Sequence, residues 1–249
     1  MLFRFALEPD AIRDEQLRQV PFSRSEHKRF LKNWERYGVM LRPVESSDGL
    51  IEAVDELPGK YRKPWKEAMR RARHLGGPSG WKGLVGIETA DQLAPLDGHL
   101  ESAFVDDATA ELALGFTEDD AQRLLPNTGI ECCRFANEND VFDEVTMRCS
   151  RLLEKGEELV NIWKEQFALR VAMAKHIAIV DRYCCHRGTR EGLEWFVTQL
   201  GSGSSALQLK VYAGIDEQCS EGDATECLRA LRKKLPGKSI ANISLHCVP

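Results

Sequence analysis

The sequence contains no apolar run close to the roughly 20 residues that a membrane-spanning helix requires. Its opening stretch, MLFRFALEPD, has an acidic residue at position 8 and lacks the small-residue site at which secretory signals are cleaved. Of the 249 residues, 43% are apolar and 29% are charged, which is ordinary for a globular protein with a buried core. These features predict a cytoplasmic protein with no membrane contact.

The eight cysteines include no C-x-x-C pair, the spacing that many zinc sites use. Four of the cysteines form two pairs of sequence neighbours, 132/133 and 184/185, and neighbouring cysteines bridge to each other only with strain. We predict reduced thiols that fill small apolar spaces, with a zinc site of Cys184, Cys185 and His186 as the alternative. Walker-type, dinucleotide-binding and Gly-x-Ser-x-Gly motifs are also lacking, so no cofactor is predicted from motifs.

The net charge of −5 is unevenly distributed along the chain. Residues 1–75 carry 16 basic and 12 acidic side chains, residues 76–169 carry 7 and 19, and residues 170–249 carry 11 and 8. The acidic middle would repel nucleic acid, whereas the two ends could tolerate it. The alternative is that the acidic middle keeps the protein soluble or that the segments neutralise one another.

The first 150 residues predict a mixed α+β region in two parts. Residues 1–75 form a basic, helix-rich part, with strands over 2–7 and 39–44 and helices over 23–37, 49–57 and 62–74. GGPSG at 76–80 has the composition of a loop, and the charge changes sign there. Residues 76–150 form an acidic α/β part with strands over 84–88, 102–107 and 129–135, a helix after Asp107, and a short helix near Thr117.

Residues 151–249 predict a helix followed by an α/β unit. A helical apolar period runs from 151 to 174. Strands over 176–181, 206–214 and 239–248 then alternate with helices over 189–201 and 224–237. This β-α-β-α-β order predicts a parallel sheet with right-handed crossovers, and the chain as a whole is of the α/β class.

The order HIAIVDRY, GLEWFVTQL, LQLKVYAG, CLRALRKKL and SIANISL resembles the phospholipase-D-like domain at the C-terminus of microtubule-interacting-and-trafficking proteins. Asp181 and Tyr183 match the Asp-x-Tyr that ends the first strand in that family. The resemblance covers about 75 of 249 residues. Related domains occur in bacterial conflict or antiviral defence systems, so it implies a bacterial defence or processing complex.

Two departures limit what the resemblance implies. The catalytic members use a His-x-Lys-x4-Asp motif, and this sequence has none, so the domain is expected to be non-catalytic. The non-catalytic relatives carry a His-Asp-Arg segment after the third strand, where this sequence ends at LHCVP. We therefore expect the unit to end early and to expose a sheet edge that a protein partner or a second copy covers.

Candidate site residues stand at strand ends, where open α/β sheets bind ligands. Asp181 ends the strand over 176–181, and either orients a ligand or forms a turn. The loop that follows could bind a phosphate or another ligand through its polar side chains, which are Arg182, Tyr183, His186, Arg187 and Arg190. Asp106 and Asp107 follow another strand, and are either metal-binding carboxylates or a helix N-cap.

Three functions follow as hypotheses. The first is a non-catalytic phospholipase-D-like subunit that mediates protein interactions or associates with nucleic acid. The second is a metal-dependent nuclease or phosphodiesterase that uses Mg²⁺ with Asp106, Asp107 or Asp181. The third is a sensor of a nucleotide or small molecule. A protein partner or self-association is expected, and nucleic acid is a further candidate partner.

Overall fold

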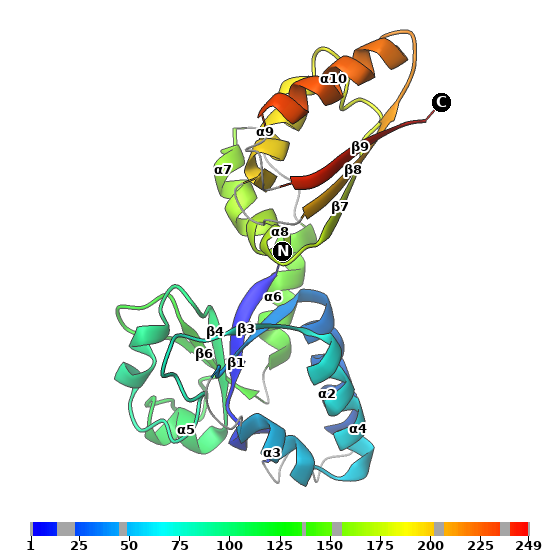
Figure 1. Cartoon of the computed structure of the whole chain (residues 1–249). Helices are drawn as coiled ribbons and strands as arrows, with labels where there is room; N and C mark the ends of the chain where they lie inside the picture. The colour runs from blue at the N-terminus through cyan, green and yellow to red at the C-terminus, as the bar shows by residue number, and fades with distance from the viewer. Residues whose placement is uncertain are drawn as a thin grey trace. The chain divides into compact units, whose positions relative to one another are not determined.

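The computed structural model describes residues 2–13, 23–44, 49–135, 138–150, 156–201, 207–234 and 240–248 (Figure 1). The chain forms two compact units, Met1–Glu154 and Lys155–Pro249. The structure therefore divides the chain differently from the prediction at 75/76, because residues on both sides of that boundary contribute strands to one sheet. The sign change in charge at GGPSG lies within the first unit and does not mark a domain boundary.

The first unit is built on a six-stranded sheet with the order β3-β2-β1-β4-β6-β5. All neighbouring strands are parallel except β5 and β6 at one edge, which are antiparallel. The strands are β1 (Phe3–Leu7), β2 (Gly38–Arg42), β3 (Arg73–Gly76), β4 (Ser102–Val105), β5 (Gln122–Leu124) and β6 (Glu131–Arg134). The helices are α2 (Ser23–Tyr37), α3 (Gly49–Glu56), α4 (Gly59–Arg71), α5 (Asp107–Leu112) and α6 (Glu138–Ser150).

The sheet of the first unit is covered on both faces, as parallel sheets usually are. Alternate residues of β1 face opposite layers: Phe3 and Phe5 pack with α2, α4 and α6, whereas Ala6 packs with the segment 84–100 and α5. The first layer is rich in aromatic rings, and Phe30 and Trp65 stack in it with centroids 5.5 Å apart. This two-sided burial fixes the strand ends at which the candidate site lies.

The second unit has a parallel sheet in the order β7-β8-β9, as the β-α-β-α-β pattern predicts. Its elements are α7 (Leu159–Ile162), a π-helical segment (Trp163–Ala168), α8 (Leu169–Ala172), β7 (His176–Val180), α9 (Arg190–Gly201), β8 (Leu207–Gly214), α10 (Glu221–Lys234) and β9 (Ile240–Val248). Helices α9 and α10 lie on the same side of the sheet (Figure 1). On the other face His176, Ala178 and Val180 are exposed.

Three local predictions in the first unit are wrong. The segment 84–88 is not a strand, because Gly83 and Gly86 adopt positive φ angles of 95° and 62° that break an extended run. The residues near Thr117 form a turn in which Thr117 bonds to Asp120, and not a helix. The basic helix predicted over 62–74 runs from Gly59 to Arg71, and Arg73–Gly76 form the strand β3 instead.

Candidate functional site

The centre of the first sheet contains a topological switch point. The chain leaves β1 towards β2 on one side, whereas β4 pairs with β1 on the other, with Leu7 opposite Phe104. The amide of Glu8 continues this pairing and donates to the carbonyl of Phe104 at 2.9 Å. In open α/β sheets the crevice outside the carboxyl ends of two such strands is where ligands bind. The residues that follow β1 and β4 are therefore the first candidates for a site.

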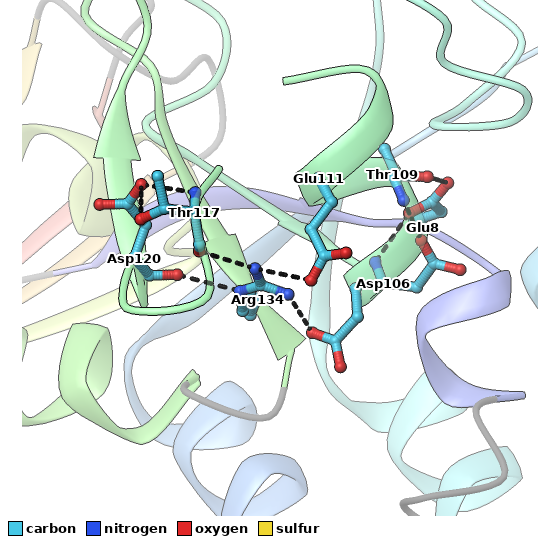
Figure 2. A network of polar contacts seen from close by, with 8 residues as sticks. Glu8, Asp106, Thr109, Glu111, Thr117, Asp120 and Arg134 are labelled. Carbon is cyan, nitrogen blue, oxygen red and sulfur yellow. Dashed lines mark hydrogen bonds and ion pairs between the residues drawn. The ribbon is translucent and has the colours of Figure 1, made fainter. Parts of the chain in front are cut away.

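Glu8 and Asp106 are the residues that immediately follow these two strands. Glu8 is only 2% exposed. Its Oε2 accepts from the Asp106 amide at 2.8 Å, and its Oε1 accepts from the Thr109 hydroxyl at 2.7 Å (Figure 2). Asp106 is the N-cap of α5, and its Oδ1 accepts from the Thr109 amide at 2.7 Å. The N-cap interpretation of Asp106 is confirmed, and the same contacts place this residue against the buried carboxyl group of Glu8.

The carboxyl group of Glu8 titrates near neutral pH. The pKa of Glu8 is raised from 4.5 to about 7, chiefly by burial; its two hydrogen bonds act against this shift, and the neighbouring charges of Asp106 and Asp10 contribute to it. A carboxyl group in this range takes up or releases a proton near pH 7, which is a common property of functional sites in clefts.

Arg134 holds the adjacent carboxylates in place. This β6 residue is largely buried, and its Nη1 donates to Asp107 at 2.7 Å while its Nη2 lies 3.2 Å from Glu111. It also donates to the carbonyl groups of Thr117 and Asp120 at 3.1 and 2.9 Å (Figure 2). Asp107 is thus an ion-pair partner in this structure, and Arg134 joins the start of α5 to the 117–120 turn.

The region around these strand ends carries an excess of negative charge. Three guanidinium groups, those of Arg13, Arg123 and Arg134, stand against six carboxyl groups in this region, which are those of Glu8, Asp10, Asp106, Asp107, Glu111 and Asp120. Hydrogen bonds from Thr117 lower the pKa of Asp120, which keeps it ionised. Across the described residues, no three His, Cys, Asp or Glu side chains are arranged so that they could hold a metal ion.

The predicted ligand-binding residues of the second unit gather in the loop after β7. Asp181 forms a turn, because its Oδ1 accepts from the Tyr183 amide at 2.8 Å. The guanidinium of Arg182 lies 5.8 Å from the centre of the Tyr183 ring. Arg190 pairs with Glu194 at 3.0 Å, whereas Arg182 and Arg187 are exposed and form no ion pair with any residue that the structure describes.

His186 in the same loop is buried, at 8% exposure. Its Nε2 lies 3.3 Å from Oδ2 of Asp216, but the geometry gives no hydrogen bond within the described parts of the chain. The neighbouring Cys184 and Cys185 have their Sγ atoms 4.0 Å apart, and neither they nor the other cysteines that the structure describes form a disulfide bond. Asp181 and Asp106 belong to different units, so the predicted candidates are divided between the two units.

Sequence reasoning missed the two most informative residues of the first unit, Glu8 and Arg134. Glu8 follows the apolar run LFRFAL just as Asp106 follows SAFV, so the same strand-end pattern could have identified it. Arg134 gives no such signal, because its partners Asp107 and Glu111 are 27 and 23 residues away in sequence and meet it only through the sheet.

Comparisons with models of protein families, with curated proteins and with solved structures find no significant match to this chain. Within the described residues, no helix has the length and apolar character needed to cross a membrane.

Proposed function

We propose that the first unit is a divalent-cation-dependent phosphodiesterase that acts on nucleic acid, with its centre at the carboxyl ends of β1 and β4. The observation that carries the proposal is the buried carboxyl group of Glu8 beside Asp106, with a pKa raised to about 7. Burial and like charges make the ionised form of Glu8 unfavourable, and a bound cation would remove that penalty by replacing the proton.

Hard divalent cations such as Mg²⁺ bind carboxylate oxygens and keep several waters. We assign Glu8 and Asp106 as the protein ligands, with waters completing the coordination shell, because Asp107 is held by Arg134 at 2.7 Å. A cation held by these residues would lower the pKa of a water bound to it, and would so supply a nucleophile for the phosphorus of a phosphodiester.

For the second unit we propose a non-catalytic role in binding, as in the phospholipase-D-like subunits of bacterial defence complexes that its sequence resembles. The observation that favours this role is the pair of exposed guanidinium groups of Arg182 and Arg187 at the carboxyl end of β7. Exposed arginines without an ion-pair partner are suited to phosphate oxygens. In this proposal the second unit holds the nucleic acid backbone and the first unit cleaves it.

The test is cleavage of labelled single-stranded and double-stranded DNA and RNA by the full chain, with Mg²⁺, Mn²⁺ or a chelator present. We expect cation-dependent cleavage that falls at least 100-fold in Glu8→Gln and in Asp106→Asn, because an uncharged amide is a poor ligand for a hard divalent cation. Both variants should still fold, since Gln and Asn keep the size and the hydrogen bonds of the residues they replace and Asn is also a good N-cap. The control is Asp143→Asn, which removes only an exposed ion pair with Arg29. Cleavage that persists in both site variants, or no cleavage with any cation, would overturn the proposal.

A further inference from the structure

An open cavity of about 810 Å³ lies between α2 and α4 of the first unit. Its size is within the range of sites that bind small molecules. Basic and aromatic side chains from both helices line it, among them His27, Lys28, Lys32, Lys60, Tyr61 and Trp65. Leu31, Pro64 and Ala68 add an apolar part to the wall. The carboxyl groups of the acidic centre do not line this cavity.

His27 provides a hydrogen-bond donor that has no acceptor. The indole Nε1 of Trp65 donates to its Nδ1 at 2.9 Å. An indole nitrogen can only donate, so Nδ1 is unprotonated and the single proton of the neutral ring is on Nε2. His27 is 4% exposed, and its Nε2 is buried with no hydrogen-bond partner in the described parts of the chain. His27 is one of the residues that line the cavity, and buried polar groups are nearly always paired, so its Nε2 is a donor that a ligand seated against this residue could satisfy.

The imidazole ring is held in this state by its surroundings. Burial, followed by the charge of Lys60, lowers the pKa of His27 to about 4, so the ring is neutral at physiological pH. It also lies against the Tyr61 ring, with centroids 4.6 Å apart. The hydrogen bond from Trp65 and the contact with the Tyr61 ring fix the orientation of the imidazole ring. Rotation of the ring to bring Nε2 to another acceptor would break the hydrogen bond from Trp65.

The lysines around the cavity give it an unbalanced positive charge. Lys28 and Lys32 form no ion pair with any described residue, and Lys60 lies 4.7 Å from the centre of the Tyr61 ring. Of the two acidic residues in the wall, Glu67 is already paired with Arg70 and Arg71. Glu35 is the other, so the three ammonium groups exceed the negative charge available to them.

We propose that this cavity binds the phosphate monoester of a nucleoside. The ammonium groups of Lys28, Lys32 and Lys60 bind the phosphate, Nε2 of His27 donates to an acceptor of the ligand, and the base packs on the apolar wall. This ligand is either a free nucleotide or the phosphorylated end of a nucleic acid strand, since both present the same group. The inference does not depend on the acidic centre or on the proposed cleavage.

Calorimetric titration of the full chain tests the site with a set of nucleoside 5′-monophosphates and the matching nucleosides. We expect nucleotide binding that weakens at least 10-fold in Lys28→Ala and in Lys60→Ala, and nucleosides that bind at least 10-fold more weakly. Lys63→Ala is the matched control, because Lys63 is exposed on α4 and does not line the cavity. Absence of nucleotide binding, equal binding of nucleosides, or an equal loss in the control would overturn the proposal.

Oligonucleotides with and without a 5′-phosphate separate the two sources of the ligand. Preference for the phosphorylated strand over the free nucleotide assigns the site to strand ends, and the reverse assigns it to free nucleotides; both outcomes require the same lysines. Nitrogen-15 spectra of histidine give an independent readout. The Nε2 proton signal of His27, assigned by its proximity to the Trp65 indole proton, should shift on binding, and an unchanged signal contradicts its role.

Discussion

Replacement of Glu8 by Gln should make the first unit more stable at high pH and leave it nearly unchanged at low pH. The folded protein keeps the Glu8 proton up to about pH 7, whereas the unfolded chain releases it near pH 4.5. Between these values the native state binds more protons than the unfolded state, so the free energy of unfolding falls as pH rises. The loss of stability is roughly 3 kcal/mol once both states are ionised.

Gln cannot ionise, so the variant avoids this loss. Its amide oxygen can accept from the Asp106 amide, and its NH₂ can donate to the Thr109 hydroxyl, which replaces both contacts of Glu8. The difference in unfolding free energy between variant and wild type should therefore be near zero at pH 4 and approach roughly 3 kcal/mol at pH 8. Nearby cations that offset part of the charge of ionised Glu8 would make the difference in unfolding free energy at pH 8 smaller, but Glu8→Gln would still be the more stable protein.

Hydrogen exchange of amides in β1 and β4 across a urea series at pH 4, 6 and 8 measures the effect in the first unit alone. Glu52→Gln is the control, because it makes the same chemical change at an exposed position of α3. A difference between Glu8→Gln and wild type that is the same at all three pH values would refute the reasoning, as would a variant that is less stable at pH 8.

Three further predictions concern other residues. Arg134→Met should lower the unfolding free energy of the first unit by about 1–3 kcal/mol, seen by urea denaturation, because this buried guanidinium loses its hydrogen bonds to two carbonyl groups and to two partly exposed carboxylates. The pKa of His27 is about 4 in the folded protein and 6.5 in the unfolded chain, so protonation of this ring destabilises the fold. In the Glu8→Gln variant, the unfolding free energy of the first unit should therefore fall by roughly 3 kcal/mol as the pH drops from 6.5 to below 4. Hydrogen exchange in α2 and α4 measures this fall, and an unfolding free energy that does not change with pH contradicts it. Replacing Arg182 and Arg187 by Ala should weaken oligonucleotide binding and reduce its salt dependence in gel-shift assays, whereas an unchanged salt slope argues against phosphate contacts.

The sequence predicted most strands of the sheets because their signal is local. Apolar runs bounded by turn residues located β1, β4, β7, β8 and β9, and the alternation with helices gave the parallel sheet of the second unit. The short strands β3 and β5 are the two edge strands of the first sheet and carry no apolar run, so only their pairing with β2 and β6 identifies them.

The site was harder to predict because it depends on strand order. Asp106 was recognised as a strand-end acid, but its partner Glu8 lies 98 residues earlier and is adjacent only because β1 and β4 pair. The ion pairs of Arg134 likewise depend on the pairing of β4 with β6. In contrast, the turn at Asp181 is made by a contact with a residue two positions away, and the sequence predicted it as one of two alternatives.

The most direct test of the acidic centre is titration of the full chain with Mn²⁺ at pH 6.5, measured by calorimetry in two buffers of different ionisation enthalpy. The account predicts that binding releases roughly 0.8 proton in wild type, because Glu8 is about three-quarters protonated at pH 6.5 and the cation displaces that proton, and that Glu8→Gln binds at least 10-fold more weakly without proton release. Binding that releases no proton, or that is unchanged in Glu8→Gln, would contradict the account.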